Sequence, residues 1–263
     1  MRTSEWLSVA FGAYIALVAA RVQWGWSRRR VAWLCAAVMI AAPIAFSRLG
    51  SVAPALRDWA PLIYVLASYY AAGALFIGPS DAFEAWLLRA DAWLLRGSRV
   101  DGLPSIAANI VEVLYTSTFL LIPTGFLILV VTGHESQADR YWTTVSAAEY
   151  VAFGVLPWLA SRPPWVILGL EVTEATGVRR FGLMWVRRTS HCANTFPSGH
   201  TAGSLAVAMA VAPFAPVAGS CLLAVAIGIA VGCVSGRYHY AVDVVTGVVV
   251  ALLVVGLVAA SGM

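Results

Sequence analysis

The sequence predicts an all-α protein, built as a polytopic bundle of transmembrane helices. Hydrophobic residues make up 60% of its 263 residues and charged residues only 11%, against about 25% charged in an ordinary soluble domain. Charge-free runs are also long. The run from Thr201 to Gly236 holds 36 residues, whereas one crossing of the hydrocarbon core takes about 20. Pro213 and Pro216 near its middle predict two helices joined by a tight turn.

The same criterion applied along the chain predicts about eight spans, near residues 5–20, 31–47, 60–79, 108–132, 143–160, 201–215, 217–235 and 240–261. The first is short and follows Arg2, which also fits a signal anchor, so seven spans are the alternative. Residues 81–99 place charged and large apolar side chains at roughly helical spacing. We expect this stretch to form an amphipathic helix in the membrane interface.

The linkers are too short to separate soluble domains, so we expect a single membrane domain over residues 1–263. All of the basic residues are arginines in loops between spans, where positive-inside bias and anionic headgroups account for them. The net charge of +4 therefore does not indicate a nucleic-acid partner. The four cysteines show no metal-ligand spacing. We infer neither a metal site, nor a cofactor, nor a disulfide framework.

Two of the four histidines, His200 and His239, stand at the entrances of apolar segments. Two predicted spans separate them, so both emerge on the same face of the membrane and can share one site. Asp243 follows His239 by four residues, which on a helix places it one turn further on the same face. A carboxylate there is costly without a partner. A hydrogen bond to His239 would fix the tautomer of the ring and leave its other nitrogen free as a nucleophile.

Ser198 and Gly199 stand where a helix is predicted to begin, so a hydroxyl and backbone N–H groups are available to an anion that the helix dipole also favours. Each feature has a plainer alternative. A lone interfacial histidine is more often a solvated residue, Pro-Ser-Gly is an ordinary helix start, and His239 and Asp243 could form a purely structural hydrogen bond. Their joint occurrence on one face favours a phosphate site.

These residues resemble the motifs of the type 2 phosphatidic acid phosphatase superfamily, whose fold is shared with vanadium haloperoxidases. The matching region is 162–247, about a third of the chain. The second motif of that family, Pro-Ser-Gly-His, is intact as residues 197–200, and the third ends in His-x3-Asp, present as residues 239–243. The resemblance implies a six-span phosphatase-like core over residues 59–263, preceded by accessory spans in residues 1–58.

The resemblance also implies a role for each residue. His239 would attack phosphorus to form a phosphohistidine, His200 would protonate the leaving alkoxide, and Asp243 would orient His239. Ser198 and the Gly199 N–H would hold the phosphoryl oxygens.

Two motif positions depart from the family. Val155 stands where the first motif, Lys-x6-Arg-Pro, has its lysine, and Cys233 stands where the third has its arginine. The departures resemble a branch that includes inositol phosphorylceramide synthase, in which Arg-Pro-Pro and His-Tyr-x2-Asp patterns occur. Phosphate clamping is then assigned to Arg162 and Arg237, because a bidentate guanidinium suits a phosphoryl group.

The leading functional hypothesis is an integral membrane lipid phosphatase that hydrolyses a phosphate monoester or pyrophosphate of a lipid through a phosphohistidine. One alternative is a lipid headgroup phosphotransferase, in which an alcohol replaces water. Another is a non-catalytic membrane protein of the same fold. The expected partners are a lipid phosphate substrate and the surrounding membrane lipids.

The orientation of the site is open to two arguments. Arginines are concentrated on the predicted active-site side, which by the positive-inside rule indicates the cytoplasm. Six of them lie in the two active-site loops, where phosphate binding explains them equally well. The resemblance implies an extracytoplasmic site, and we expect that orientation, in a bacterial plasma membrane.

Overall fold

The computed structural model describes residues 1–21, 25–50, 52–96, 103–169 and 177–263. These parts are predominantly helical, and their one β feature is an isolated bridge between Ser161 and Asn194. The all-α prediction is confirmed. The helices are α1 (Thr3–Arg21), α2 (Trp26–Leu49), α3 (Pro54–Trp59), α4 (Pro61–Ala74), α5 (Asp81–Leu94), α6 (Ser105–Thr116), α7 (Thr118–Val131), the 3-10 turn η2 (Glu135–Gln137), α8 (Ala138–Val155), α9 (Pro164–Ile167), α10 (Gly177–Thr189), α11 (Gly199–Val211), α12 (Pro216–Ser235) and α13 (Ala241–Ala260).

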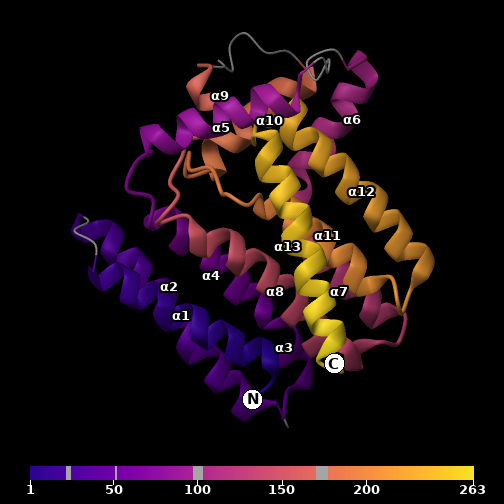
Figure 1. Ribbon diagram of the computed structural model, residues 1–263. Helices are drawn as coiled ribbons and strands as arrows, with labels where there is room; N and C mark the ends of the chain where they lie inside the picture. Colours follow the sequence, from indigo (N-terminus) through magenta and orange to yellow (C-terminus); the bar gives the residue numbers. More distant parts are fainter. Residues whose placement is uncertain (22–24, 51, 97–102, 170–176) are drawn as a thin grey trace.

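Helix α11 is the central element of the bundle, and it packs against α7, α8, α12 and α13. Most of its side chains are small, and nearly all of them are buried. Small residues allow neighbouring helices to approach closely, and in lipid, where the hydrophobic effect does not drive helices together, this close packing stabilises their association. The termini lie near one end of the bundle, whereas α5, α9 and α10 cross the other end (Figure 1).

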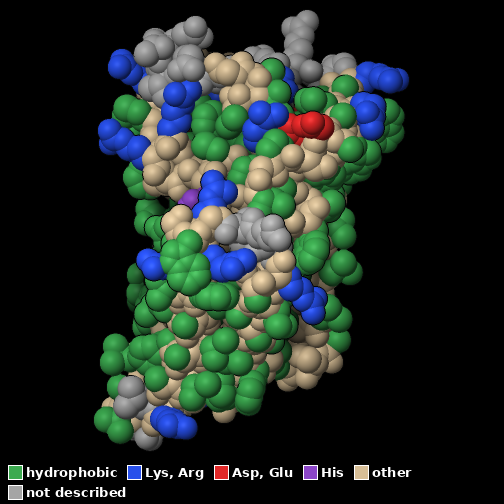
Figure 2. Space-filling model, turned by 90° about the vertical axis from the view of Figure 1, so that its left-hand side faces the viewer, with side chains coloured by type: hydrophobic (Ala, Val, Ile, Leu, Met, Phe, Trp, Pro, Cys, Tyr) green, Lys and Arg blue, Asp and Glu red, His purple; other side chains and the backbone are tan. Residues whose placement is uncertain are grey.

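Four helices are long and apolar enough to cross a membrane: α1, α2, α12 and α13. Helices α6 and α7 together form a fifth candidate, bent by 67° between Thr116 and Thr118. A polytopic helix bundle is therefore confirmed, while the count of eight or seven spans stays a prediction. Exposed leucines and valines on α13, such as Leu253 and Leu257, are suited to contact with lipid. On the face shown in Figure 2, hydrophobic side chains dominate the lower half, and basic ones gather mainly in the upper half.

Helix α5 is the amphipathic segment expected in the interface. Ser80 caps it by accepting a hydrogen bond from the Phe83 N–H at 3.4 Å, as serine commonly does at a helix start. Glu84 and Leu87 are its buried residues. The helix lies across the end of the bundle, at an angle to α13 (Figure 1), so its buried edge covers the loops that connect the other helices.

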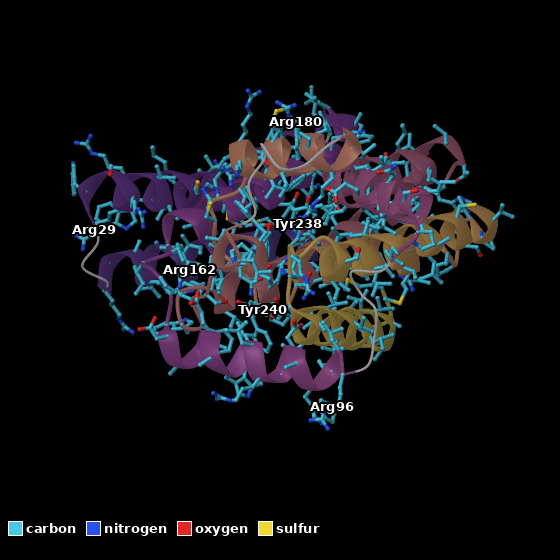
Figure 3. The ribbon with its side chains drawn as sticks, turned by 90° about the horizontal axis from the view of Figure 1, so that it is seen from above. Arg29, Arg96, Arg162, Arg180, Tyr238 and Tyr240 are labelled. Atoms are coloured by element: carbon cyan, nitrogen blue, oxygen red, sulfur yellow. The ribbon has the colours of Figure 1, made fainter. Side chains whose placement is uncertain are left out.

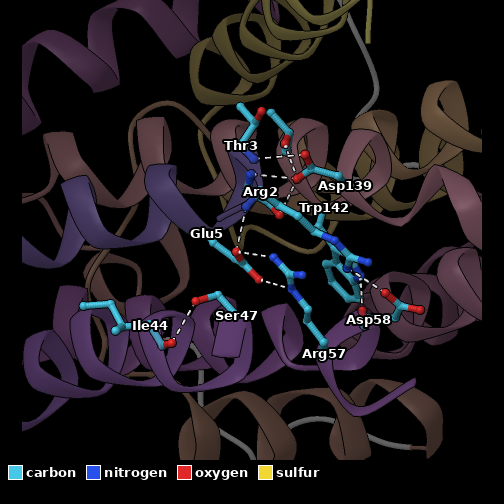
Figure 4. Close-up of polar contacts among 11 residues, drawn as sticks. Arg2, Thr3, Glu5, Ile44, Ser47, Arg57, Asp58, Asp139 and Trp142 are labelled. Carbon is cyan, nitrogen blue, oxygen red and sulfur yellow. Dashed lines mark hydrogen bonds and ion pairs between the residues drawn. The ribbon is translucent and has the colours of Figure 1, made fainter. Parts of the chain in front are cut away.

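Polar contacts fasten the N-terminal helix α1 to α3 and α8 (Figure 4). The buried carboxylate of Glu5 accepts hydrogen bonds from Arg57 at 2.6 and 2.9 Å. Asp139 accepts from the backbone N–H groups of Thr3 and Ser4, both at 2.9 Å. The first helix is thus held to the helices that follow it by charged hydrogen bonds as well as by apolar packing.

Candidate active site

The first side of the site is the N-terminus of α11. Ser198 is the capping residue: its Oγ accepts from the Thr201 N–H at 3.3 Å, and its own N–H donates to the Asp243 carbonyl at 3.0 Å. The Gly199 N–H donates to the Thr195 hydroxyl at 3.3 Å. The two groups predicted to hold phosphoryl oxygens are therefore already engaged within the protein, and Ser198 is fully buried.

The second side is the connection between α12 and α13. The backbone turns sharply at Arg237, whose φ of 58° lies in the left-handed region, and the N–H groups of Tyr238 and His239 both donate to the Cys233 carbonyl at 2.9 Å. This turn directs His239 back toward the start of α11. Asp243, in the first turn of α13, accepts from the Tyr240 N–H at 3.0 Å through Oδ2.

The three predicted catalytic residues come together at these two helix starts. His239 Nδ1 lies 3.4 Å from Asp243 Oδ2, and His239 Nε2 lies 3.3 Å from His200 Nδ1. If the proton on Nδ1 points to the carboxylate, Nε2 is unprotonated and is the nitrogen that faces His200. The carboxylate, the first imidazole and the second imidazole thus form a continuous row.

Burial changes the pKa of His239, the first imidazole of this row. The side chain of His239 is 5% exposed, and desolvation lowers its pKa to about 4. The ring is therefore neutral near pH 7, which is the state that a nitrogen nucleophile requires.

Aromatic rings hold the second imidazole in place. Tyr115 stacks on the His200 ring at a centroid distance of 5.0 Å and on Tyr238 at 3.8 Å, while Phe119 meets His200 edge-on at 5.8 Å. Tyr115 and Phe119 belong to α6 and α7, more than 80 residues before His200 in the chain. No local sequence pattern indicates their role, because only the fold brings these helices beside α11.

The two predicted phosphate-clamping arginines lie against α5. Arg162 donates to both oxygens of Glu84, at 3.0 and 2.8 Å, and Arg237 lies 3.8 Å from Asp91. The Arg162 guanidinium lowers the pKa of the Glu84 carboxyl. Seen from above, Arg162 lies inside the outline of the bundle, between Arg29 and Tyr240, whereas Arg29, Arg96 and Arg180 lie at the periphery (Figure 3).

A cavity of about 270 Å³ lies beside the histidines. Its walls are mainly apolar and come from α4, α6, α7, α8, α10 and α11. His200 and His239 line it, as does Glu149, the one carboxyl among its described lining residues. Neither Arg162 nor Arg237 is among those residues. In the described chain, no group of three or more histidines, cysteines or acidic residues could hold a metal ion.

Fold and site together define a helical membrane protein with a His-His-Asp row at the starts of two neighbouring helices. The family model described as the PAP2 superfamily matches residues 81–257 of the chain. The chain therefore belongs to the PAP2 superfamily, and this membership supports a phosphatase- or phosphotransferase-type function. No curated protein and no solved structure shows significant similarity to the chain. The matched residues include all three members of the row.

Proposed function

We propose that the protein is a lipid phosphatase that works through a phosphohistidine on His239. The observation that carries this proposal is the row itself, with His239 Nε2 3.3 Å from His200 Nδ1 and Nδ1 3.4 Å from Asp243. One nitrogen is oriented by a carboxylate, and the other meets a second proton carrier. This arrangement suits nucleophilic attack with assisted departure of the leaving group.

The first half-reaction replaces a P–O bond by a P–N bond. As His239 Nε2 bonds to phosphorus, the bond to the lipid oxygen breaks, and protonated His200 gives its proton to that oxygen. Negative phosphate beside His200 favours the protonated imidazole. Asp243 stabilises the positive charge that develops on His239, as a buried carboxylate does for an imidazolium.

Water completes the cycle. His200, now neutral, takes a proton from water as the water oxygen attacks phosphorus, and the P–N bond breaks to release phosphate. Ser198, Gly199, Arg162 and Arg237 would bind the phosphoryl oxygens, provided that their present partners yield. The apolar cavity beside the histidines supports a lipid as the organic part of the substrate.

Phosphate release from phosphatidate, lysophosphatidate and a polyprenyl pyrophosphate tests the proposal with the purified protein. We expect release by the wild type, none by His239→Ala, and full release by His134→Ala, a control in the turn before η2. Label from the lipid phosphate should appear on the wild type in an acid-labile, alkali-stable form. A wild type that neither releases phosphate nor takes up label would indicate the non-catalytic alternative.

A phosphotransferase would share the first half-reaction. The Arg162-Pro163-Pro164 sequence and the Tyr240 that follows His239 favour it, because both patterns resemble the transferase branch. Labelled phosphate that moves to an added alcohol, rather than to water, would identify this activity.

We also propose that the site lies outside the cytoplasm. Because α13 leads from the site to the opposite end of the bundle (Figure 1), a reporter fused after Met263 should then lie in the cytoplasm. Fluorescence of a fused green fluorescent protein, without activity of a fused alkaline phosphatase, is the expected result. The reverse pattern would place the site in the cytoplasm.

A further inference from the structure

Glu149 on α8 differs from the other buried glutamates in the described parts of the chain. Glu5, Glu84 and Glu112 each form an ion pair with an arginine. Glu149 is only 6% exposed, yet no hydrogen-bond donor in the described parts of the chain reaches its carboxyl. A buried polar group without a partner is costly and calls for an explanation.

Two glycines of α11 make room for this carboxyl. A Cβ on Gly203 would overlap Glu149 Oε1, and a Cβ on Gly199 would lie 3.1 Å from Oε2. The carboxyl therefore lies along the first turn of α11, beside the residue that precedes His200. An apolar side chain at position 149 would pack against α11 equally well, because the glycines that it would meet there carry no polar side chain.

Glu149 also lines the cavity that His200 and His239 line. A ligand bound there would have its reacting phosphate at the histidines and its organic part along the apolar walls. Glu149 is the carboxyl available to that organic part among the described lining residues.

We propose that Glu149 binds a hydroxyl group of a molecule in this cavity and thereby sets the substrate specificity of the site. This inference rests on the proposed function. A hydroxyl both donates and accepts, so it satisfies a carboxyl in either ionisation state. A phosphoryl oxygen only accepts and is repelled by a carboxylate, and an alkyl chain offers no hydrogen bond.

The hydroxyl could come from either of two sources. A lipid phosphate can carry one on the carbon next to the phosphate ester. Alternatively, the O–H belongs to the acceptor that attacks the phosphohistidine, which is water or an alcohol. Both sources place an O–H near His200, so the experiment has one arm for each.

The first arm measures binding to a protein that cannot turn over. In the His239→Ala background, we compare hexadecyl phosphate with 2-hydroxyhexadecyl phosphate by calorimetry. We expect the hydroxylated ligand to bind about tenfold more tightly, as one hydrogen bond to a charged group allows. That preference should vanish with Glu149→Leu and persist in part with Glu149→Gln, because the amide oxygen still accepts.

The second arm measures the acceptor. With labelled hexadecyl phosphate, which carries no hydroxyl, and added glycerol, Glu149→Leu should leave the formation of phosphohistidine unchanged. It should slow the breakdown of phosphohistidine about tenfold, or shift its partition between water and glycerol. Thr144→Val, a buried change on the same helix outside the cavity, is the matched control and should behave as wild type.

A response in the first arm assigns the hydroxyl to the lipid, and a response in the second assigns it to the acceptor. If Glu149→Leu folds like the wild type and neither arm responds, the inference is wrong. A wild type without phosphohistidine would overturn the proposed function separately. The binding arm would then still decide on Glu149, and the absence of a hydroxyl preference there would end the inference.

Discussion

The lowered pKa of His239 predicts an unusual pH dependence at the scale of a single residue. The pH dependence of kcat/KM reports the ionisation of the free enzyme. A histidine with an ordinary pKa of about 6.5 would lose about 25-fold in its neutral fraction between pH 7 and pH 5. With a pKa of about 4, the neutral nucleophile persists through this range and is lost only as the pH falls through that value.

We therefore expect no decline in kcat/KM between pH 7 and pH 5, after correction for the separately titrated ionisation of the substrate phosphate, because His239 stays neutral while the protonated fraction of the proton donor His200 can only rise as the pH falls. An alkyl phosphate with one defined ionisation is the appropriate substrate. A corrected decline of tenfold or more above pH 5 would show that His239 titrates as a solvated histidine does.

Asp243 is expected to serve both folding and catalysis, and two substitutions separate these roles. Asp243→Asn keeps a side-chain oxygen for the Tyr240 N–H but loses the negative charge beside His239. We expect kcat to fall by about 10²- to 10⁴-fold with little change in thermal stability. Asp243→Ala should lose activity to the same extent and also about 1 kcal/mol of stability from the lost cap. Equal melting temperatures for the two variants would contradict the capping role.

Prediction at the residue scale succeeded where local rules apply. Counting spans placed His200 and His239 on one face, and the four-residue spacing placed Asp243 beside His239. Nothing local indicates that Tyr115 stacks on His200 or that Glu149 lies beside Gly203, because these contacts join distant helices. The carboxylates that engage Arg162 and Arg237 belong to α5, whose amphipathic pattern is evident in the sequence but whose position over the site is not.

At the scale of an element, the pairing of α5 with Arg162 gives opposite predictions for its two partners. If Arg162 binds substrate phosphate, Arg162→Ala should lower kcat/KM by about 10- to 100-fold, the value of a charge-assisted hydrogen bond. Glu84→Gln removes the competing carboxylate and should lower KM or leave it unchanged. Its cost in stability should be small, because the Arg162 side chain is 41% exposed.

Steady-state kinetics on the same lipid phosphate check both variants. If Glu84→Gln is as inactive as Arg162→Ala while both remain folded, Glu84 holds Arg162 in its working position and does not compete with the substrate for it.

The close approach between α12 and α6 gives a second prediction at this scale. A Cβ on Gly232 would lie 2.6 Å from the Val111 carbonyl oxygen, whereas Gly256 on α13 has nothing within 4 Å. We expect Gly232→Ala to destabilise the protein by about 1–3 kcal/mol and Gly256→Ala to stabilise it by up to about 1 kcal/mol. Melting temperatures in one detergent compare the pair, and equal values would mean that α6 shifts freely.

Elements were predictable where the apolar pattern is continuous. The spans near 217–235 and 240–261 correspond closely to α12 and α13. The polar region 161–199, in contrast, contains the helix α10, which length and hydropathy criteria for spans do not detect. The span near 108–132 is broken between α6 and α7, and the bend places Tyr115 and Phe119 around His200. Such a break serves tertiary packing, so periodicity alone does not reveal it.

At the scale of the whole molecule, the contact between α1 and α3 predicts a large effect far from the site. Arg57→Ala would leave the Glu5 carboxylate, 2% exposed, without its cation. Breaking a buried pair costs about 3–5 kcal/mol, and the lower end applies because the Arg2 N–H still donates to Glu5 at 2.6 Å. The melting temperature should fall clearly for Arg57→Ala and little for the control Arg48→Ala on exposed α2 surface.

Activity per folded molecule should remain unchanged in Arg57→Ala, because the network lies at the end of the bundle opposite the histidines. A parallel loss of activity and stability would indicate instead that α1 and α3 hold the cavity in shape.

The cavity has a further consequence for how this protein relates to others of its family. Its α4 wall, which includes Leu62, Val65 and Tyr69, lies outside the matched region 81–257, while the histidines lie within it. One part of the wall that would contact the lipid in the proposed function thus lies outside the matched stretch, whereas α6, α7, α8, α10 and α11 supply the rest from within it. If the proposed function holds, changes in α4 should alter which chain length is accepted while they leave the histidine row intact.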